Sequence, residues 1–194
     1  MNPLNMKPMT TAILISTLGM SGYTIADDDT RFHLLALESS NTSIESLSPA
    51  VRELINGVIT EVELDDHRDE QVAYQFEWVD LDENSHHKVS YAVNDLTVLE
   101  QKTSDLSSFG FSKIDKDEQV AIQEVAKSQF DILSVIPKLE EKYAAKLVEA
   151  ELETKDGLVF YEVKLASTET GKHKLLVDVA SGEEIPMLKK QRNH

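Results

Sequence analysis

The clearest pattern of apolar and polar positions lies in residues 117–188. Two successive stretches carry apolar side chains three and four residues apart, the spacing of one helical face. Each stretch follows an aspartate that can cap a helix, Asp117 for the first and Asp131 for the second. The pattern predicts two helices, and Pro137 is expected to kink the second or to mark an irregular start. Their apolar positions are Val120, Ile122, Val125 and Ala126, then Ile132, Val135, Ile136, Leu139 and Tyr143.

From residue 148 the apolar positions recur every second residue, which predicts strands with one buried and one solvent-facing side. Asp156-Gly157 is a strong signal for a hairpin between the first two strands. A third strand is expected around residues 175–179 and a fourth at 184–188, where Pro186 favours a sheet edge. The first strand alternates Val148, Ala150 and Leu152 with Glu149, Glu151 and Glu153, and the second presents Val159, Tyr161, Val163 and Leu165.

Residues 27–101 follow the same order of elements with weaker signals. Helices are expected at 32–37 and 43–55, the second ended by Gly57. Tyr74, Phe76 and Trp78 share one face of a strand and are expected to form much of the local core. Residues 102–116 are polar and predict a linker that can dock on the fold. The strands of this region are expected at 58–64, 72–79, 89–93 and 97–100.

The two regions are related by an internal repeat with an offset of about 88 residues. The offset is 88 for Pro49 and Pro137, 87 for Tyr74 and Tyr161, and 86 for His87 and His173, as one-residue differences in turns would produce. The predicted fold class is therefore α+β, with two units that each pack two helices on an antiparallel sheet of about four strands. Because a unit of about 70 residues is marginally stable alone, contact between the units is expected.

The N-terminal residues 1–26 read as a secretory signal. Lys7 precedes an uncharged apolar run at 9–20, and small residues lead to an expected cleavage after Ala26. About 12 apolar positions are too few to span a bilayer comfortably. The expected location is periplasmic or secreted, with no membrane insertion after cleavage; an uncleaved anchor or a disordered tail is the alternative.

Composition narrows the possible functions. The chain contains no cysteine, which excludes disulfides, thiolate metal sites and a cysteine nucleophile. Its formal charge of −16 disfavours binding to nucleic acid and to anionic lipid. The same charge favours solubility, or else attraction of a basic partner or a cation. Residues 189–194 form a basic tail.

No motif indicates catalysis or a bound cofactor. The chain has no Gly-x-Ser-x-Gly, no His-Glu-x-x-His and no phosphate-binding loop. His86-His87 is expected in a polar turn, and adjacent residues on an extended chain point to opposite faces, which disfavours a shared metal. We therefore expect a non-enzymatic protein with no catalytic, cofactor-binding or metal-binding residues.

Rows of carboxylates are the one unusual surface feature. Glu149, Glu151 and Glu153 share one strand face, with side chains about 7 Å apart at each step. Such a row can dock a basic surface or bind a hard cation such as calcium, or it is simply a solvated strand face. The first region repeats the arrangement with Glu61, Glu63 and Asp65.

Residues 117–187 resemble the PepSY domain family in the order of four short segments. The first region resembles it less closely, because Tyr74-Gln75-Phe76-Glu77 replaces Tyr-Glu-Val and the glycine turn is missing after Val93. The segments are Ala121-Ile122-Gln123-Glu124-Val125-Ala126, Val148-Glu149-Ala150-Glu151-Leu152-Glu153, Tyr161-Glu162-Val163 and Val177-Asp178-Val179-Ala180-Ser181-Gly182-Glu183.

The resemblance implies a protein that binds a secreted or envelope peptidase, such as a metallopeptidase, and inhibits it or assists its folding. Contact by strand addition is expected. A ligand- or metal-sensing module of an envelope signalling system and a structural envelope subunit are the alternatives, and a homodimer is compatible with each. The expected contact residues are Glu149, Glu151, Glu153, Glu184 and Leu188.

Overall fold

The computed structural model describes residues 28–40, 42–68, 70–108, 111–112 and 114–186. The expected signal sequence, its cleavage site after Ala26, the basic tail at 189–194 and Leu188 lie outside the described residues.

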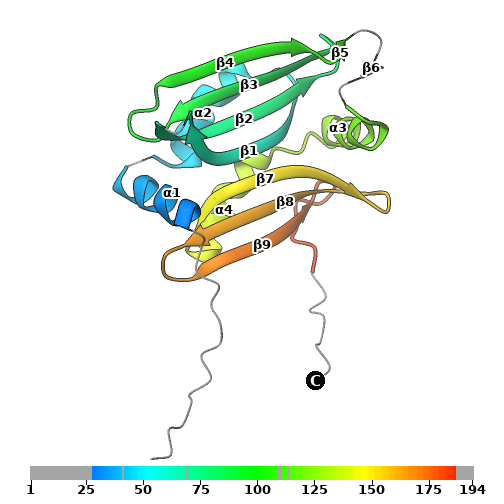
Figure 1. The fold of residues 1–194 in the computed structure, drawn as a ribbon. Coiled ribbons are helices and arrows are strands. Elements are labelled where there is room, and N and C mark those ends of the chain that lie inside the picture. The colour runs from blue at the N-terminus through cyan, green and yellow to red at the C-terminus, as the bar shows by residue number, and fades with distance from the viewer. Residues whose placement is uncertain (1–27, 41, 69, 109–110, 113, 187–194) are drawn as a thin grey trace, which may run out of the picture.

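The described residues form an α+β fold, as predicted, in which four helices pack with a seven-stranded antiparallel sheet (Figure 1). The strand order is β4-β3-β2-β1-β7-β8-β9. The strands of this sheet are β1 (Val58–His67), β2 (Gln71–Asp80), β3 (Ser85–Ala92), β4 (Val98–Asp105), β7 (Lys146–Lys155), β8 (Leu158–Ser167) and β9 (Gly171–Asp178). The short strands β5 (Ser107–Ser108) and β6 (Phe111–Ser112) pair with each other, and the helices are α1 (Asp28–Ser39), α2 (Ile44–Leu54), α3 (Lys116–Ser128) and α4 (Ile132–Tyr143).

Strands from both halves of the chain belong to one sheet, because β1 pairs with β7. The second half contributes three strands to it. The fourth strand expected at 184–188 is reduced, in the described residues up to 186, to one bridge between Val177 and Glu184. Pro186 has no backbone N–H, so it cannot donate a hydrogen bond that would extend this pairing.

Corresponding elements begin at nearly constant spacing along the chain. β1 begins at Val58 and β7 at Lys146, 88 residues later, and the starts of α1 and α3 are separated by the same interval. The starts of β2 and β8 are 87 residues apart, and those of β3 and β9 are 86 apart. These intervals match the offsets of the sequence repeat.

The starts of α2 and α4 agree with the sequence, whereas α1 begins at Asp28, four residues before the expected start, and the cap of α3 also differs. Ser43 and Asp131 cap α2 and α4, and both helices keep an internal proline, Pro49 or Pro137. The cap of α3 is Asp115 rather than the expected Asp117. Its carboxylate accepts hydrogen bonds from the backbone of Asp117 and Glu118, and the Glu118 side chain accepts one from Asp115 N–H. A glutamate three residues after the cap completes this box, which Asp117 cannot do.

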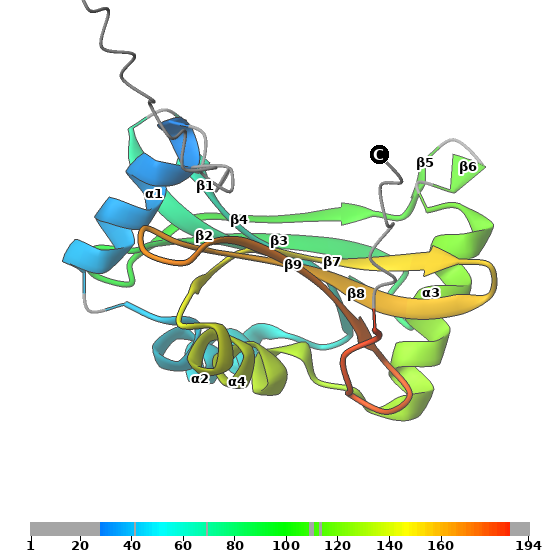
Figure 2. The same ribbon diagram turned by 90° about the horizontal axis from the view of Figure 1, so that it is seen from below.

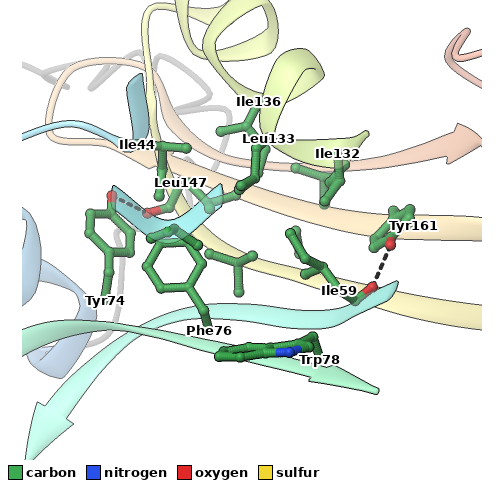
Figure 3. Packing of buried hydrophobic residues seen from close by; sticks show 14 of the residues in the cluster. Ile44, Ile59, Tyr74, Phe76, Trp78, Ile132, Leu133, Ile136, Leu147 and Tyr161 are labelled. Atoms are coloured by element: carbon green, nitrogen blue, oxygen red, sulfur yellow. Dashed lines mark hydrogen bonds between the residues drawn. The ribbon is translucent and has the colours of Figure 1, made fainter. Parts of the chain in front are cut away.

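The core lies between the sheet and the helix pair α2 and α4 (Figure 2). As predicted, Tyr74, Phe76 and Trp78 are buried on one face of β2, and Tyr161 is buried on β8. Figure 3 shows these side chains facing the apolar residues of α2 and α4. Helices α1 and α3 lie at opposite ends of the central strands (Figures 1 and 2).

Two β-bulges change which side chains point inward on the central strands. The register of β7 shifts between Leu147 and Glu149, so Leu147 and Ala150 are buried while Val148, expected inside, is half-buried. The register of β1 shifts at the corresponding place, between Ile59 and Glu61. A bulge opposes two residues to one and locally breaks the alternation on which the sequence pattern depends.

Further boundaries differ from expectation. Strand β3 begins at Ser85 and β9 at Gly171, each four residues before the expected start. Helix α2 ends with Ile55 as its C-cap, and Gly57 instead lies where the chain approaches β2. Its φ is +152°, and a Cβ there would stand 2.2 Å from the Val79 carbonyl oxygen. Strand β4 runs to Asp105, so it extends well beyond the expected end at residue 100 and enters the expected linker.

Candidate functional site

Six glutamates gather on the sheet face opposite α2 and α4, and we call them the central carboxylates. They lie there because their neighbours along each strand, such as Val62, Phe76 and Ala150, point into the core. Register brings them together: Glu61 on β1 is opposite both Glu77 and Glu151. The set consists of Glu61 and Glu63 on β1, Glu77 on β2, Glu149 and Glu151 on β7 and Glu162 on β8.

Basic side chains neutralise only part of this set. The Lys164 Nζ lies 2.6 Å from a Glu149 carboxylate oxygen and 3.7 Å from one of Glu162. The Lys174 Nζ lies 2.6 Å from a carboxylate oxygen of Glu162. Lys88 and His86 approach Glu77 at 3.3 Å and 2.9 Å. Within the described part of the chain, no ion pair reaches Glu61, Glu63 or Glu151.

The uncompensated charge is centred on Glu61. Burial, reinforced by the charges of Glu77, Glu63, Glu151 and Glu149, raises the pKa of Glu61 to about 7. Burial also raises the pKa of Glu63 and of Glu151, with nearby carboxylates acting in the same direction. The pKa of Glu77 is lowered instead, first by its hydrogen bond with His86. Glu61 therefore exchanges its proton near neutral pH, and a cation placed beside it would favour its ionised form.

A cavity of about 270 Å³ opens beside Glu61, between the sheet and α3. Its polar lining comes from Thr60, Glu61, Glu77, Glu151 and His86 on the sheet and Glu118 on α3. Its apolar lining includes Val79, Leu106, Ala121, Ile122 and Leu152. A cavity with several carboxylates and an apolar wall matches a side chain that combines an aliphatic stem with a cationic end, as lysine and arginine do.

Only part of the expected contact surface is assembled by the fold. Glu149 and Glu151 belong to the central carboxylates, and Glu153 lies farther along β7, opposite Phe160. Glu184 does not join them, because its carboxylate accepts hydrogen bonds from Lys142 and from the Tyr143 hydroxyl of α4. Its position beside α4 puts it on the helix side of the sheet. Leu188 lies outside the described residues.

Sequence reasoning missed Glu77 and Glu162, and it did not bring the two carboxylate rows together. The repeat contained a usable signal. If equivalent strands pair antiparallel around a local two-fold axis, Glu61 is placed opposite Glu151 and Glu63 opposite Glu149, as the register shows. Asp65 is exposed and lies toward the end of β1, opposite Ala73.

The histidine pair lies on strand β3, not in the expected turn, which occupies residues 81–84. His86 points to Glu77, whereas the His87 ring stacks on Trp78 with centroids 4.9 Å apart. The His87 ring nitrogens also contact the hydroxyls of Ser85 and Thr103. In the part of the chain that the structure describes, no group of three or more potential ligand residues is arranged to hold a metal ion.

Comparison with known proteins gives little further information. No protein-family profile matches the chain, and no curated protein matches it. The fold is similar to a crystal structure from Clostridium difficile 630 described as a "putative lipoprotein", with a TM-score of 0.39 and 18% sequence identity over 73% of this chain and 88% of that one. Among the described helices, none has the length and apolar character needed to cross a membrane.

Proposed function

We propose that this chain is a non-enzymatic binding protein of the bacterial envelope that docks a basic segment of a partner protein on its central carboxylates. One observation carries the proposal: the half-buried Glu61 stands among four other carboxylates with no ion-pair partner in the described residues. A charge left unpaired in a partly desolvated place is unfavourable in the free protein, and a partner's cation would relieve it.

The cavity beside Glu61 supports this mode of binding. A lysine or arginine side chain could place its stem against Leu106 and Ile122 and its charge between Glu61 and Glu151. A basic partner would also be attracted from a distance by the formal charge of −16. Binding of this kind depends strongly on ionic strength, because surface charges are screened within about 10 Å at 0.1 M salt.

The resemblance to PepSY domains supplies the partner class. We propose that each half of the chain is a PepSY-like unit and that the partner is a secreted or envelope peptidase, which the protein inhibits or helps to fold. The matching spacing of α1/α3, β1/β7, β2/β8 and β3/β9 supports two related units. Among residues 184–186, the described part of the expected strand, the bridge is at Glu184, and we propose the sheet face as the contact in place of strand addition.

An inhibition assay tests this function. Purified protein is added to metallopeptidases isolated from the envelope or medium of the source organism, and proteolysis is measured as a function of protein concentration. A saturable fall in activity is expected for the native protein. The fall should be lost in Glu61→Lys, which puts a cation where the partner's cation would bind.

Glu169→Lys is the matched control, because Glu169 is exposed in the turn between β8 and β9 and its substitution by lysine changes the charge by the same amount. It should inhibit like the native protein. Equal inhibition by both variants would reject the carboxylate face as the docking surface. A stable complex without any change of activity would indicate a structural envelope subunit, and thermal stabilisation by calcium, copper or zinc alone would indicate a sensing module.

A further inference from the structure

We propose that the pairing of β1 with β7, which we call the seam, depends on pH. The two strands pair firmly in mildly acidic solution. In alkaline solution the pairing is weakened by repulsion between the facing glutamates Glu61–Glu151 and Glu63–Glu149. This inference concerns how the two halves of the sheet are held together. It does not depend on the proposed partner.

The register of the junction carries the inference. Three residue pairs link β1 to β7, and in two of them a glutamate directly faces a glutamate. Residues directly opposite in an antiparallel pair have Cβ atoms about 4.5–5.5 Å apart, and like charges at such positions are destabilising. Between them lies the apolar pair Val62 and Ala150, both fully buried. The seam therefore has an apolar centre flanked by two pairs of facing carboxylates, and in one of them, Glu63–Glu149, Lys164 neutralises part of the charge.

The surrounding basic groups compensate only part of the negative charge at the seam. The other acidic groups facing the four glutamates are Glu77 on β2, Glu162 on β8 and Glu118 on α3, with Asp65 and Glu153 farther along β1 and β7. The basic ones are His86 and Lys88 on β3, Lys164 on β8 and Lys174 on β9. These basic groups form ion pairs with Glu77, Glu149 and Glu162, and none of the ion pairs among the described residues reaches Glu61 or Glu151. Burial and the neighbouring carboxylates raise the pKa of Glu151, and they outweigh Lys164, which acts on Glu151 from farther away and lowers its pKa.

Protonation removes the repulsion in an accessible pH range. The pKa of Glu61 is raised to about 7 by burial and by its neighbours, and those of Glu63 and Glu151 are raised as well. A neutral carboxylic acid can also donate a hydrogen bond to the carboxylate that faces it. The repulsion is thus weak at mildly acidic pH and grows as the pH rises through 7.

On the opposite side of the seam, two tyrosine contacts between the halves do not change over this range. There the Tyr74 and Tyr161 hydroxyls bind backbone carbonyls of the other half, at Leu147 and Ile59. Burial raises the pKa of both tyrosines above the ordinary value, so they stay protonated. Loosening should therefore be a local opening of the β1–β7 ladder, without separation of the halves.

Hydrogen exchange followed by mass spectrometry tests the seam. Protection factors, corrected for the intrinsic pH dependence of exchange, are compared near pH 6 and near pH 8.5. Protection in β1 and β7 should fall about tenfold at the higher pH relative to β3 and β8, the factor that corresponds to one unit of pKa. Glu61→Gln and Glu151→Gln should each remove most of this fall, and the charge-matched control Glu169→Gln should keep it.

Equal loss of protection across all strands would contradict a local seam, as would an unchanged fall in both Glu61→Gln and Glu151→Gln. Neither result involves a partner, so the proposal of a pH-sensitive seam can be rejected while the proposed docking surface is unaffected. Conversely, the absence of peptidase inhibition would leave the exchange result unaffected.

Discussion

The Tyr74 hydroxyl on β2 donates a hydrogen bond to the Leu147 carbonyl on β7, 3.2 Å away, and so ties the first half of the sheet to the second (Figure 3). Tyr161 on β8 makes the reciprocal bond to the Ile59 carbonyl on β1. Ile59 and Leu147 each adjoin a β-bulge, where the regular ladder is interrupted. Each half thus supplies the donor for an irregular backbone position in the other.

Removing either hydroxyl should destabilise the whole fold. We expect Tyr74→Phe and Tyr161→Phe each to lower the free energy of unfolding by about 1–3 kcal/mol, because each leaves a buried carbonyl without its donor. Urea denaturation measures the change. Tyr91→Phe is the matched control: Tyr91 is buried in the same core, and the contact shown for it is a ring contact with Phe76. A loss at Tyr91 equal to the other two would mean that ring packing, not the hydrogen bond, is being measured.

Stability should rise as the pH falls from about 8 to about 5.5, because the folded protein binds a proton at Glu61 more tightly than the unfolded chain does. The contribution is fully present below the unfolded pKa of 4.5 and is lost as the pH rises through about 7. After allowance for solvent screening, we expect it to be about 1 kcal/mol.

Urea midpoints measured across this pH range, at constant ionic strength, test the sign. In Glu61→Gln the slope should be flatter, and the variant should be more stable than the native protein at about pH 8, because the repulsion is gone. A native protein that loses stability on going from about pH 8 to 5.5 would show that Glu61 is not protonated in the folded state.

Gly57 should not tolerate any side chain. In Gly57→Ala the new Cβ would meet the Val79 carbonyl oxygen at 2.2 Å, at a φ of +152°, and we expect a loss of at least about 2 kcal/mol. Gly157→Ala is the matched control, since its φ is also positive but its Cβ would meet nothing within 4 Å. That change should cost only about 1 kcal/mol. Thermal or urea denaturation measures the stability lost in each variant. Equal losses would show that the positive φ alone, and not the contact with Val79, makes glycine necessary at position 57.

The cap of α3 can be tested by a pair of alanine substitutions. Asp115→Ala should destabilise the protein by about 1 kcal/mol, because its carboxylate accepts hydrogen bonds from two backbone N–H groups. Asp117→Ala should have a smaller effect, since no side-chain hydrogen bond to the Asp117 carboxylate is present in the described residues. Urea denaturation measures the loss of stability in both variants. A larger loss in Asp117→Ala than in Asp115→Ala would contradict the assignment of Asp115 as the cap.

Local patterns predicted what depends on neighbouring residues along the chain. The hairpin at Asp156-Gly157, the buried face of Tyr74, Phe76 and Trp78, and the cap at Asp131 were all expected from spacing and residue type, and all are present. The bulges at Ile59 and Leu147 were not, because an extra residue in a strand leaves no reliable mark on periodicity.

The candidate site was only half predicted for a similar reason. Glu149 and Glu151 stood out as a row, and the repeat pointed to Glu61 and Glu63. Their meeting depends on β1 pairing with β7, a contact between residues about 90 positions apart that local pattern does not encode. The partial burial that raises the pKa of Glu61 follows from that pairing and from the position of α3. The sequence pattern therefore could not predict this burial either.

The most direct measurement is the calorimetric affinity of the purified protein for an extended decapeptide in which lysine alternates with valine. Binding should be saturable at about 50 mM salt, should weaken at least tenfold at about 500 mM, and should be lost when norleucine replaces lysine. The double variant that combines Glu61→Gln with Glu151→Gln should bind the peptide at least about tenfold more weakly than the single variant Glu169→Gln does, because it loses a partly desolvated ion pair with the peptide. Equal affinities for these two variants, or no binding at low salt, would contradict docking of a basic segment on the central carboxylates.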